Sequence, residues 1–503
     1  MSLLFKGGRI KSTKRKIVCF TSSIEDDVKL LKHVIDINRA HTVMMMKHGI
    51  SSQDGVEILK ALKKLDKPKM RRYLEDIHVY VEEAVIKGTK GQAGENLHIA
   101  KSRNDQVATA IRMELREQLI NLMETVIDFQ EGLLSKAEKY VQTVMQGYTH
   151  LRPAQPITFA HYLLYHFDVF QRHVERLVEC YNRVNVCPMG AAALATTSFP
   201  ISREMVAELL GFADVLENSI DAVSSRDFVM ETLATLAMVA IDISRLTEDL
   251  IIWSAPEFNL IEIPDEFCST SSIMPQKKNP DVLEVIRARM SHVIGNFTTC
   301  ALILKSLPSG YNLDFQEATP KLWESCAKVK EALRILSELA VASEPIQDLE
   351  NPNLAFSTFT ELVRVLFQKY NVPFRTAHKI VGGLVRKIVE NKINPKDVTA
   401  EMLRKVAEEV SGLSLAVAED DVKTSVDVAN FVKMHNVKGG PAPMEVKRMI
   451  NSRRKMLAKT RRLVAKMDTS IRDAIKNLDD LVEKLIEQQN EVVQLKNETH
   501  LEV

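Results

Sequence analysis

Hydroxyl groups, lysines and a helix start come together between residues 269 and 281 (STSSIMPQKKNPD). The run has no hydrophobic period, which predicts a loop. Asn279 is a favourable N-cap and Pro280 suits the first position of a following helix. Because a helix start and an ammonium group both attract anions, we predict an anion site here. Lys277 and the helix end would lower the pKa of Ser271, so that this serine could act as a base. The alternative is an ordinary polar loop before a capped helix.

Three other polar stretches are candidates for chemistry: residues 98–105 (HIAKSRND), 147–156 (GYTHLRPAQP) and 310–317 (GYNLDFQE). In the first, Ser102 or Asn104 could simply cap a long helix. The functional interpretation is that Arg103 and Asn104 offer donors to a carboxylate ligand.

The second and third stretches also allow two interpretations each. We expect residues 147–156 to form a two-proline turn between long helices, in which a lone histidine is more often structural. His150, beside the hydroxyl of Thr149, could instead be an acid–base group near neutral pH. Residues 310–317 are either an interhelical turn or a cluster of phenol, amide and carboxylate groups for a polar substrate.

Long helices must position these stretches. From Val107 to Leu133 apolar residues recur at steps of three or four, which predicts one helix of about nine turns. Similar patterns cover residues 156–186, 221–255, 279–305 and 319–342, and strand alternation is almost absent. We therefore expect an all-α protein with a central bundle of long helices. The four polar stretches lie at breaks between helices, where loops can converge on a common cleft.

Composition limits the classes of function. The 503 residues are 45% hydrophobic and 26% charged, and the net charge is +1, which argues against bulk nucleic-acid binding. The six scattered cysteines indicate reduced thiols in a cytosolic protein, without a zinc site. No secretory signal is recognisable, and the most apolar run is too short to span a membrane. The basic residues that follow Met444 are best explained as a solvated helix face, with an oligomer or RNA contact as the minority interpretation.

The four stretches resemble successive motifs of the argininosuccinate lyase family, within the fumarase/aspartase superfamily. The residues that carry this resemblance are 98–106, 149–158, 271–281 and 311–317, with 193–200 (ALATTSFP), 221–228 (DAVSSRDF) and 372–378 (VPFRTAH). The resemblance covers roughly residues 20–450. It implies a three-domain all-α fold, with an N-terminal domain at 1–106, the central bundle at 107–350 and a C-terminal domain at 351–503.

The resemblance also implies an activity. Members of this family split argininosuccinate into arginine and fumarate by anti elimination, without metal or organic cofactor, in the cytoplasmic synthesis of arginine. They are homotetramers, and each active site takes its motifs from three subunits. We therefore expect a small-molecule substrate, no nucleic acid and no membrane.

Individual roles follow from the family's motifs. Ser271 would be the general base, and Lys277 and Asn279 would stabilise the doubly charged aci-carboxylate intermediate. His150, oriented by Glu284, would belong to the acid side, which protonates the departing nitrogen. The residues that would hold the substrate are Ser102, Arg103, Asn104, Thr149, Arg226, Tyr311, Gln316 and Lys321.

The sequence departs from the family at several positions. Thr270 replaces a glycine, Arg152 a glutamine, Lys101 an arginine, Leu313 a basic residue, Thr319 a lysine and Asn38 a serine. Three rival interpretations stay open at this point. One is a sibling lyase acting on adenylosuccinate or aspartate, one is a catalytically silent protein like the lens crystallins of this family, and one is a helical scaffold that binds RNA.

Overall fold

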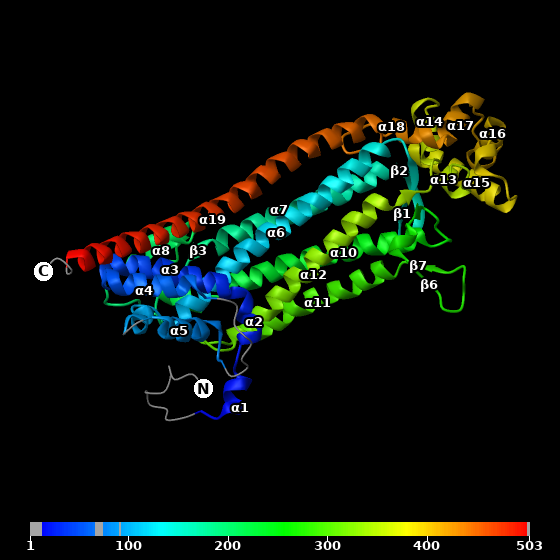
Figure 1. The fold of residues 1–503 in the computed structure, drawn as a ribbon. Coiled ribbons are helices and arrows are strands. Elements are labelled where there is room, and N and C mark those ends of the chain that lie inside the picture. The colour runs from blue at the N-terminus through cyan, green and yellow to red at the C-terminus, as the bar shows by residue number, and fades with distance from the viewer. Residues whose placement is uncertain (1–12, 66–73, 90–91, 500–503) are drawn as a thin grey trace.

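A bundle of long helices forms the centre of the computed structural model, which describes residues 13–65, 74–89 and 92–499. The bundle helices run up and down in chain order (Figure 1): α6 (Arg103–Lys139), α7 (Phe159–Val184), α10 (Asp227–Ser254), α11 (Asp281–Leu304) and α12 (Phe315–Ala342). The predicted all-α class is confirmed, and each predicted long helix is present. Residues 221–255 are divided, because the chain leaves the helical path at Ser225 between α9 (Ser219–Ser224) and α10.

Helix α6 is the axis of the bundle. It contacts α7, α12 and the last helix of the chain, so its apolar residues are buried around most of its circumference. Phe129 of α6 and Phe170 of α7 pack edge to face with ring centroids 4.8 Å apart. Apolar side chains spaced by three and four residues therefore pack against neighbouring helices on several sides of α6. This packing explains why the helix continues unbroken for 37 residues.

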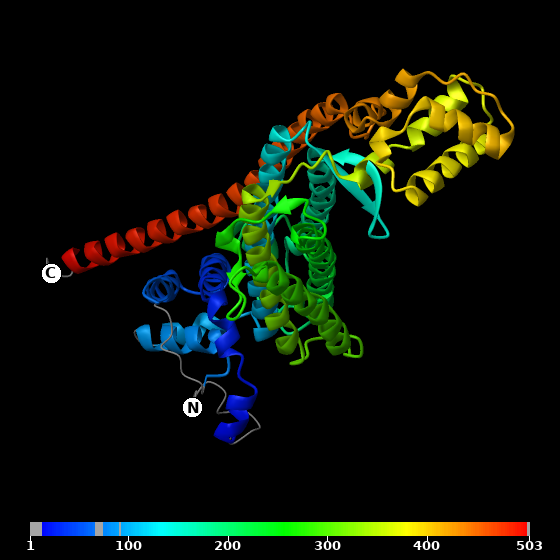
Figure 2. The ribbon, with the colours of Figure 1, turned by 90° about the vertical axis from the view of Figure 1, so that its right-hand side faces the viewer.

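The remaining elements lie at the two ends of the bundle. The N-terminal elements are α1 (Arg15–Phe20), α2 (Ile24–Asp27), η1 (Val28–Leu30), α3 (Leu31–His48), α4 (Ser52–Lys63), α5 (Ile77–Gly88) and η2 (Ala93–His98). Between α7 and α10 lie β3 (Val186–Cys187), α8 (Arg203–Leu209), β4 (Asp214–Val215) and α9. The far end carries β5 (Ile261–Glu262), η3 (Asp265–Phe267), β8 (Glu344–Pro345), α13 (Pro352–Phe356), α14 (Thr360–Gln368), α15 (Phe374–Glu390), η4 (Pro395–Asp397), α16 (Ala400–Ser411), α17 (Glu419–Val426) and α18 (Val428–Met434). Figure 2 shows that α14 to α17 project sideways as a separate head, which has its own apolar core, whereas α13 and α18 pack with Val144 in a small cluster of their own.

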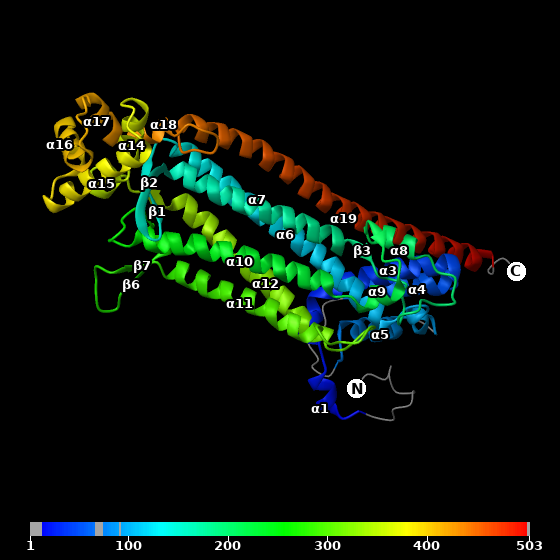
Figure 3. The ribbon, with the colours of Figure 1, turned by 180° about the vertical axis from the view of Figure 1, so that it is seen from behind.

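The last helix, α19 (Pro443–Thr499), turns back from the head and runs along the bundle to the N-terminal helices (Figure 3). Its basic first half faces acidic residues of α6 and α7. Arg453 donates to both carboxylate oxygens of Asp168 at 2.9 and 2.6 Å, and Arg454 binds Glu138 in the same way at 2.6 Å. The basic stretch is therefore used in packing within the chain. In the described part of the chain no helix is long and apolar enough to cross a membrane.

A β-hairpin replaces the turn expected at residues 147–156. Strands β1 (Val144–Thr149) and β2 (Arg152–Thr158) pair antiparallel, with an irregularity between Gln146 and Tyr148. The prediction of a simple turn is wrong because prolines normally argue against strands. In a two-stranded ribbon the missing N–H of a proline can face outward, so prolines are tolerated there.

Candidate active site

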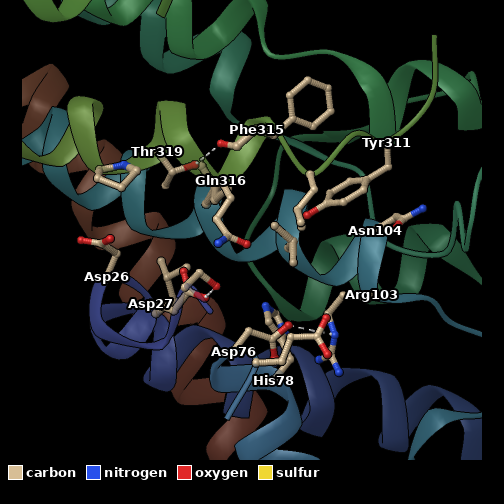
Figure 4. Close-up of a pocket in the computed structure, with 17 residues that line it drawn as sticks. Asp26, Asp27, Asp76, His78, Arg103, Asn104, Tyr311, Phe315, Gln316 and Thr319 are labelled. Atoms are coloured by element: carbon tan, nitrogen blue, oxygen red, sulfur yellow. Dashed lines mark hydrogen bonds and ion pairs between the residues drawn. The ribbon is translucent and has the colours of Figure 1, made fainter. Parts of the chain in front are cut away.

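A cavity of about 240 Å³ lies where the N-terminal helices, the start of α6 and the connection between α11 and α12 meet (Figure 4). Four of the predicted site residues line it: Arg103, Asn104, Tyr311 and Gln316. The other lining residues are Ser23, Asp26, Asp27, Leu30, Glu75, Asp76, His78, Val107, Ile111, Leu313, Phe315, Thr319 and Pro320. Segments more than two hundred positions apart in the sequence therefore form one pocket.

A capping box fixes the start of α6. Ser102 is the N-cap, its hydroxyl accepts a hydrogen bond from the N–H of Asn104, and Asp105 accepts one from the N–H of Ser102 at 3.0 Å. Asp105 is fully buried and also accepts from the N–H groups of Gly190 and Ala192. Burial raises the pKa of Asp105 to about 6, and these three N–H donors oppose the rise. Of the two candidate caps, Ser102 is the one used, which leaves Asn104 free for another role.

Two polar side chains project from this helix start. Arg103 Nε lies 3.2 Å from a carboxylate oxygen of Asp76, and its NH2 group lies 3.6 Å from Glu82. That NH2 group is buried and makes no hydrogen bond within the described chain. Asn104 donates to the carbonyl of Ala193 at 3.0 Å, so the loop containing residues 193–200 is attached to the same corner. The geometry leaves a guanidinium donor available to a ligand.

The opposite wall of the pocket comes from the start of α12. Tyr311 and Phe315 pack edge to face at 5.7 Å, and Gln316 donates to the carbonyl of Thr21 at 3.0 Å. Burial raises the pKa of Tyr311, which keeps its phenol a neutral donor. Arg226 lies behind this wall, with its guanidinium 4.3 Å from the Phe315 ring centroid. Burial lowers the pKa of Arg226 to about 10.

Arg226 and Lys321 were also predicted to hold substrate, and neither lines the pocket. Arg226 is buried and donates to the carbonyl of Ser225 at 2.8 Å, so it supports the wall. Lys321 extends toward Glu324, 3.8 Å away, and Thr319 and Pro320 face the cavity in its place.

Sequence reasoning missed the acidic side of the pocket. Asp26, Asp27, Glu75 and Asp76 all line it, and only Arg103 among the described lining residues carries a fixed positive charge. Burial raises the pKa of Asp27 to about 7, while a hydrogen bond from Ser23 opposes the rise. These acids were overlooked because they resemble helix-start residues, and Asp76 does cap α5 through the N–H of Val79 at 2.7 Å. The sequence did offer one signal for an acidic pocket, namely a pair of adjacent acids at each of two separate helix starts.

The predicted base lies elsewhere, in the exposed loop between β6 (Ser269–Thr270) and β7 (Lys278–Asn279). Ser271 Oγ accepts hydrogen bonds from the N–H groups of Ile273 at 3.3 Å and Met274 at 3.1 Å. Two N–H donors directed at one oxygen favour its ionised form, which is a stabilisation that the sequence analysis did not anticipate. Lys277 is exposed on the same loop.

The predicted helix cap in this loop is wrong. Asn279 belongs to β7 and pairs with Ser269, while α11 begins at Asp281 with Pro280 in the capping position and no side-chain cap. Pairing of the two short strands draws Asn279 into a ladder before the helix can begin. Asp281 instead accepts a hydrogen bond from the hydroxyl of Ser269.

The remaining predicted catalytic residues are exposed as well. Thr149 and His150 lie at the tip of the β1–β2 hairpin, and Glu284 lies on the first turn of α11. In the described parts of the chain no hydrogen bond or ion pair joins the hairpin tip to Glu284 or to the Ser271 loop. The Ser271 loop precedes α11 and the pocket follows it, so the two are separated by the whole length of that helix (Figure 1). Within one chain the four stretches do not converge on one cleft.

One side-chain group outside the pocket has the composition of a metal site. His33, Glu114 and Glu117 bring ligand atoms within 4.8 Å of one another between α3 and α6. Each carboxylate already has a partner, since Gln118 donates to Glu114 at 2.6 Å and Lys32 pairs with Glu117. The simplest description of this group is an ion-pair network.

Comparisons with known proteins agree on one family. Residues 27–295 match the family described as Lyase, and residues 356–433 match the argininosuccinate lyase C-terminal family. An argininosuccinate lyase of Methanococcus aeolicus is 40% identical over 461 residues, covering 90% of this chain and 93% of the relative. That of Methanocaldococcus jannaschii is 40% identical over 467 residues, covering 91% and 95%. The chain belongs to the argininosuccinate lyase family. It is therefore an enzyme, a lyase, with the fold of the fumarase/aspartase superfamily.

Solved structures support the same assignment. A variant of EDDS lyase with bound fumarate superposes on this lyase with a TM-score of 0.86 at 30% identity, covering 92% of this chain and 93% of the other. A class II fumarase of Schistosoma mansoni gives a TM-score of 0.69 at 16% identity, covering 84% of this chain and 96% of the other, which supports the fold alone.

Proposed function

We propose that this lyase cleaves argininosuccinate to arginine and fumarate, as a step in the cytoplasmic synthesis of arginine. The observation that carries the proposal is the charge of the pocket formed by the start of α6 and the start of α12. Its four carboxylates suit a substrate whose leaving part is a guanidinium with an amino group. Arg103, Asn104, Tyr311 and Gln316 would hold the polar groups around it.

The same charge separates this substrate from its rivals. Adenylosuccinate carries a phosphate, which the carboxylates of the pocket would repel. Aspartate would be split into ammonia and fumarate. Ammonia is too small a leaving part to make use of a cavity of about 240 Å³ lined with acids. A silent structural protein has no need for Ser271, with two N–H donors at its oxygen. The ion pairs of α19 likewise make RNA a poor candidate partner.

The chemistry assigns one task to each exposed loop. Ser271 would take the proton from the succinyl carbon, with its alkoxide stabilised by the N–H groups of Ile273 and Met274. Lys277 and Asn279 would stabilise the aci-carboxylate that forms. His150, oriented by Glu284, would act on the acid side and protonate the departing guanidinium nitrogen. Elimination then breaks the C–N bond and leaves fumarate and arginine.

A shared site in a homotetramer explains why these groups are far apart in one chain. The pocket lies at one end of the bundle and the Ser271 loop at the other, so a second copy running in the opposite direction can bring them together (Figure 1). Large apolar side chains on the outer faces of α10 and α11 are exposed, as an interface requires: Met238, Ile241, Val285, Ile294 and Leu302.

Release of fumarate, followed by ultraviolet absorbance, tests the proposal. The purified protein should release fumarate from argininosuccinate at a rate far above that from adenylosuccinate or aspartate. Equal or greater turnover of either rival substrate would contradict the assignment.

A further inference from the structure

We propose that Arg152 determines substrate specificity by binding the carboxylate at the amino-acid end of the substrate, in a site that a second copy of the chain completes. This inference rests on the proposed function. Argininosuccinate has three carboxylates, whereas the described residues of the pocket supply four carboxylates and one arginine.

The charge of that one arginine is partly neutralised within the chain, although its NH2 group still has a donor to offer. Arg103 is paired with Asp76 at 3.2 Å and lies 3.6 Å from Glu82, so part of its charge is neutralised. The opposite wall supplies no further cation, since Leu313 and Thr319 face the cavity there and Lys321 does not line it. The carboxylate beyond the guanidinium therefore needs a cation from another part of the assembly.

The register of the hairpin places Arg152 beside a residue already assigned to the site. Thr149 and Arg152 are directly paired across β1 and β2. Directly opposed residues project their side chains on the same face of a ribbon, with Cβ atoms about 4.5–5.5 Å apart. Any site that receives the hydroxyl of Thr149 therefore receives the Arg152 side chain at its edge.

The backbone at the tip of the hairpin is strained, as is common at binding sites. His150 and Leu151 between the paired residues have φ values of 56° and 55°, in the left-handed region that favours glycine or asparagine. Strain of this kind is concentrated at functional sites. The tip is also exposed, with Leu151 at 63%, so its side chains are available to a second copy.

Arg152 is free to bind an anion. It is exposed, and no carboxylate lies within ion-pair distance of it among the residues that the structure describes. A guanidinium can bind a carboxylate through two parallel N–H bonds, which a glutamine or a lysine cannot reproduce. Arg152 thus supplies the cation that the pocket lacks.

The test compares two substrates that differ by one carboxylate. One is argininosuccinate, and the other is the analogue in which agmatine, the decarboxylated form of arginine, replaces arginine. Arg152→Gln should raise KM for argininosuccinate at least tenfold and change kcat by less than threefold. The analogue lacks the carboxylate that Arg152 would bind, so its kcat/KM should fall much less than that of argininosuccinate in the same variant. For Arg152→Lys, KM for argininosuccinate should lie between the values of the wild type and of Arg152→Gln.

A second variant supplies the missing charge from the opposite wall. Adding Thr319→Lys to Arg152→Gln should lower KM for argininosuccinate again, because a lysine there would face the cavity. Arg462→Gln, which removes an exposed arginine of α19, is the matched control and should not alter either KM.

Two results would overturn the inference. One is an equal loss on both substrates in Arg152→Gln, which would place Arg152 at a carboxylate they share or in a purely structural role. The other is an unchanged KM for argininosuccinate. Failure of the proposed function itself would look different, since the wild-type protein would then release no fumarate from argininosuccinate.

Discussion

At the scale of single residues, the environment of Ser271 decides whether it can act as a base. Ser271→Ala removes the hydroxyl while leaving the loop's strand pairing and Lys277 in place. We expect kcat to fall by about 10²–10⁴-fold or more, with folding and substrate binding retained, as measured by fumarate release and by calorimetric titration. Ser272→Ala is the control and should stay active. If Ser272→Ala abolishes turnover and Ser271→Ala keeps more than about a tenth of the rate, the base has been assigned to the wrong serine.

We expect Asp27 to make substrate binding depend on pH. Its pKa is raised to about 7 by burial, so the carboxyl is neutral below that pH and charged above it. Only the charged form attracts a guanidinium strongly, and Asp26, Asp76 and Arg103 are the other charges that face it. KM for argininosuccinate should fall about tenfold between pH 6 and 8, because the ionised fraction rises from about a tenth to about nine tenths.

Asp27→Asn is the matched variant for this dependence. It should bind argininosuccinate more weakly at pH 8 and should show a nearly flat KM across the same range. The same slope in the variant as in the wild type would show that another group is titrating.

At the scale of elements, α19 joins the two ends of the molecule. Its second half packs against α3, α4 and α8, and Leu478 there is completely buried. Leu478→Ala should lower the free energy of unfolding by about 2–5 kcal/mol, because a cavity replaces the leucine. Leu463→Ala, on the same helix but 44% exposed, should change it by less than about 0.5 kcal/mol. Equal thermal midpoints for the two variants would show that α19 does not hold the N-terminal helices.

At the scale of the whole molecule, the separation of the pocket from the exposed loops supports the proposal of a homotetramer with shared sites. Mixed tetramers of a His150→Asn subunit and a Ser271→Ala subunit should regain activity that neither variant has alone. With random assembly about a quarter of the wild-type rate is expected, since one site in four draws both intact residues. The measurement is fumarate release after joint unfolding and refolding. A monomeric mass at micromolar concentration, or no recovery in mixed tetramers, would contradict the shared site.

The sequence by itself determined the helices and the positions of four polar stretches between them. Periods of three and four from Val107 to Leu133 add many small local preferences, so the central part of α6 (Arg103–Lys139) could be predicted, although not its ends. The start of α6 is also encoded locally, because the capping box joins Ser102 and Asp105, which are only three residues apart. Resemblance of the motifs then gave the family, which the comparisons confirm.

Only the tertiary structure decided which residues share a pocket. Gln316 donates to the carbonyl of Thr21, 295 positions away, and no local pattern encodes such a contact. The acids around Asp27 and Asp76 looked like helix starts until packing brought them beside Arg103. The β1–β2 hairpin and the displaced start of α11 depended on strand pairing, which overrode the local signals of proline and asparagine. Local preferences of about 1 kcal/mol or less per residue yield wherever long-range contacts are stronger.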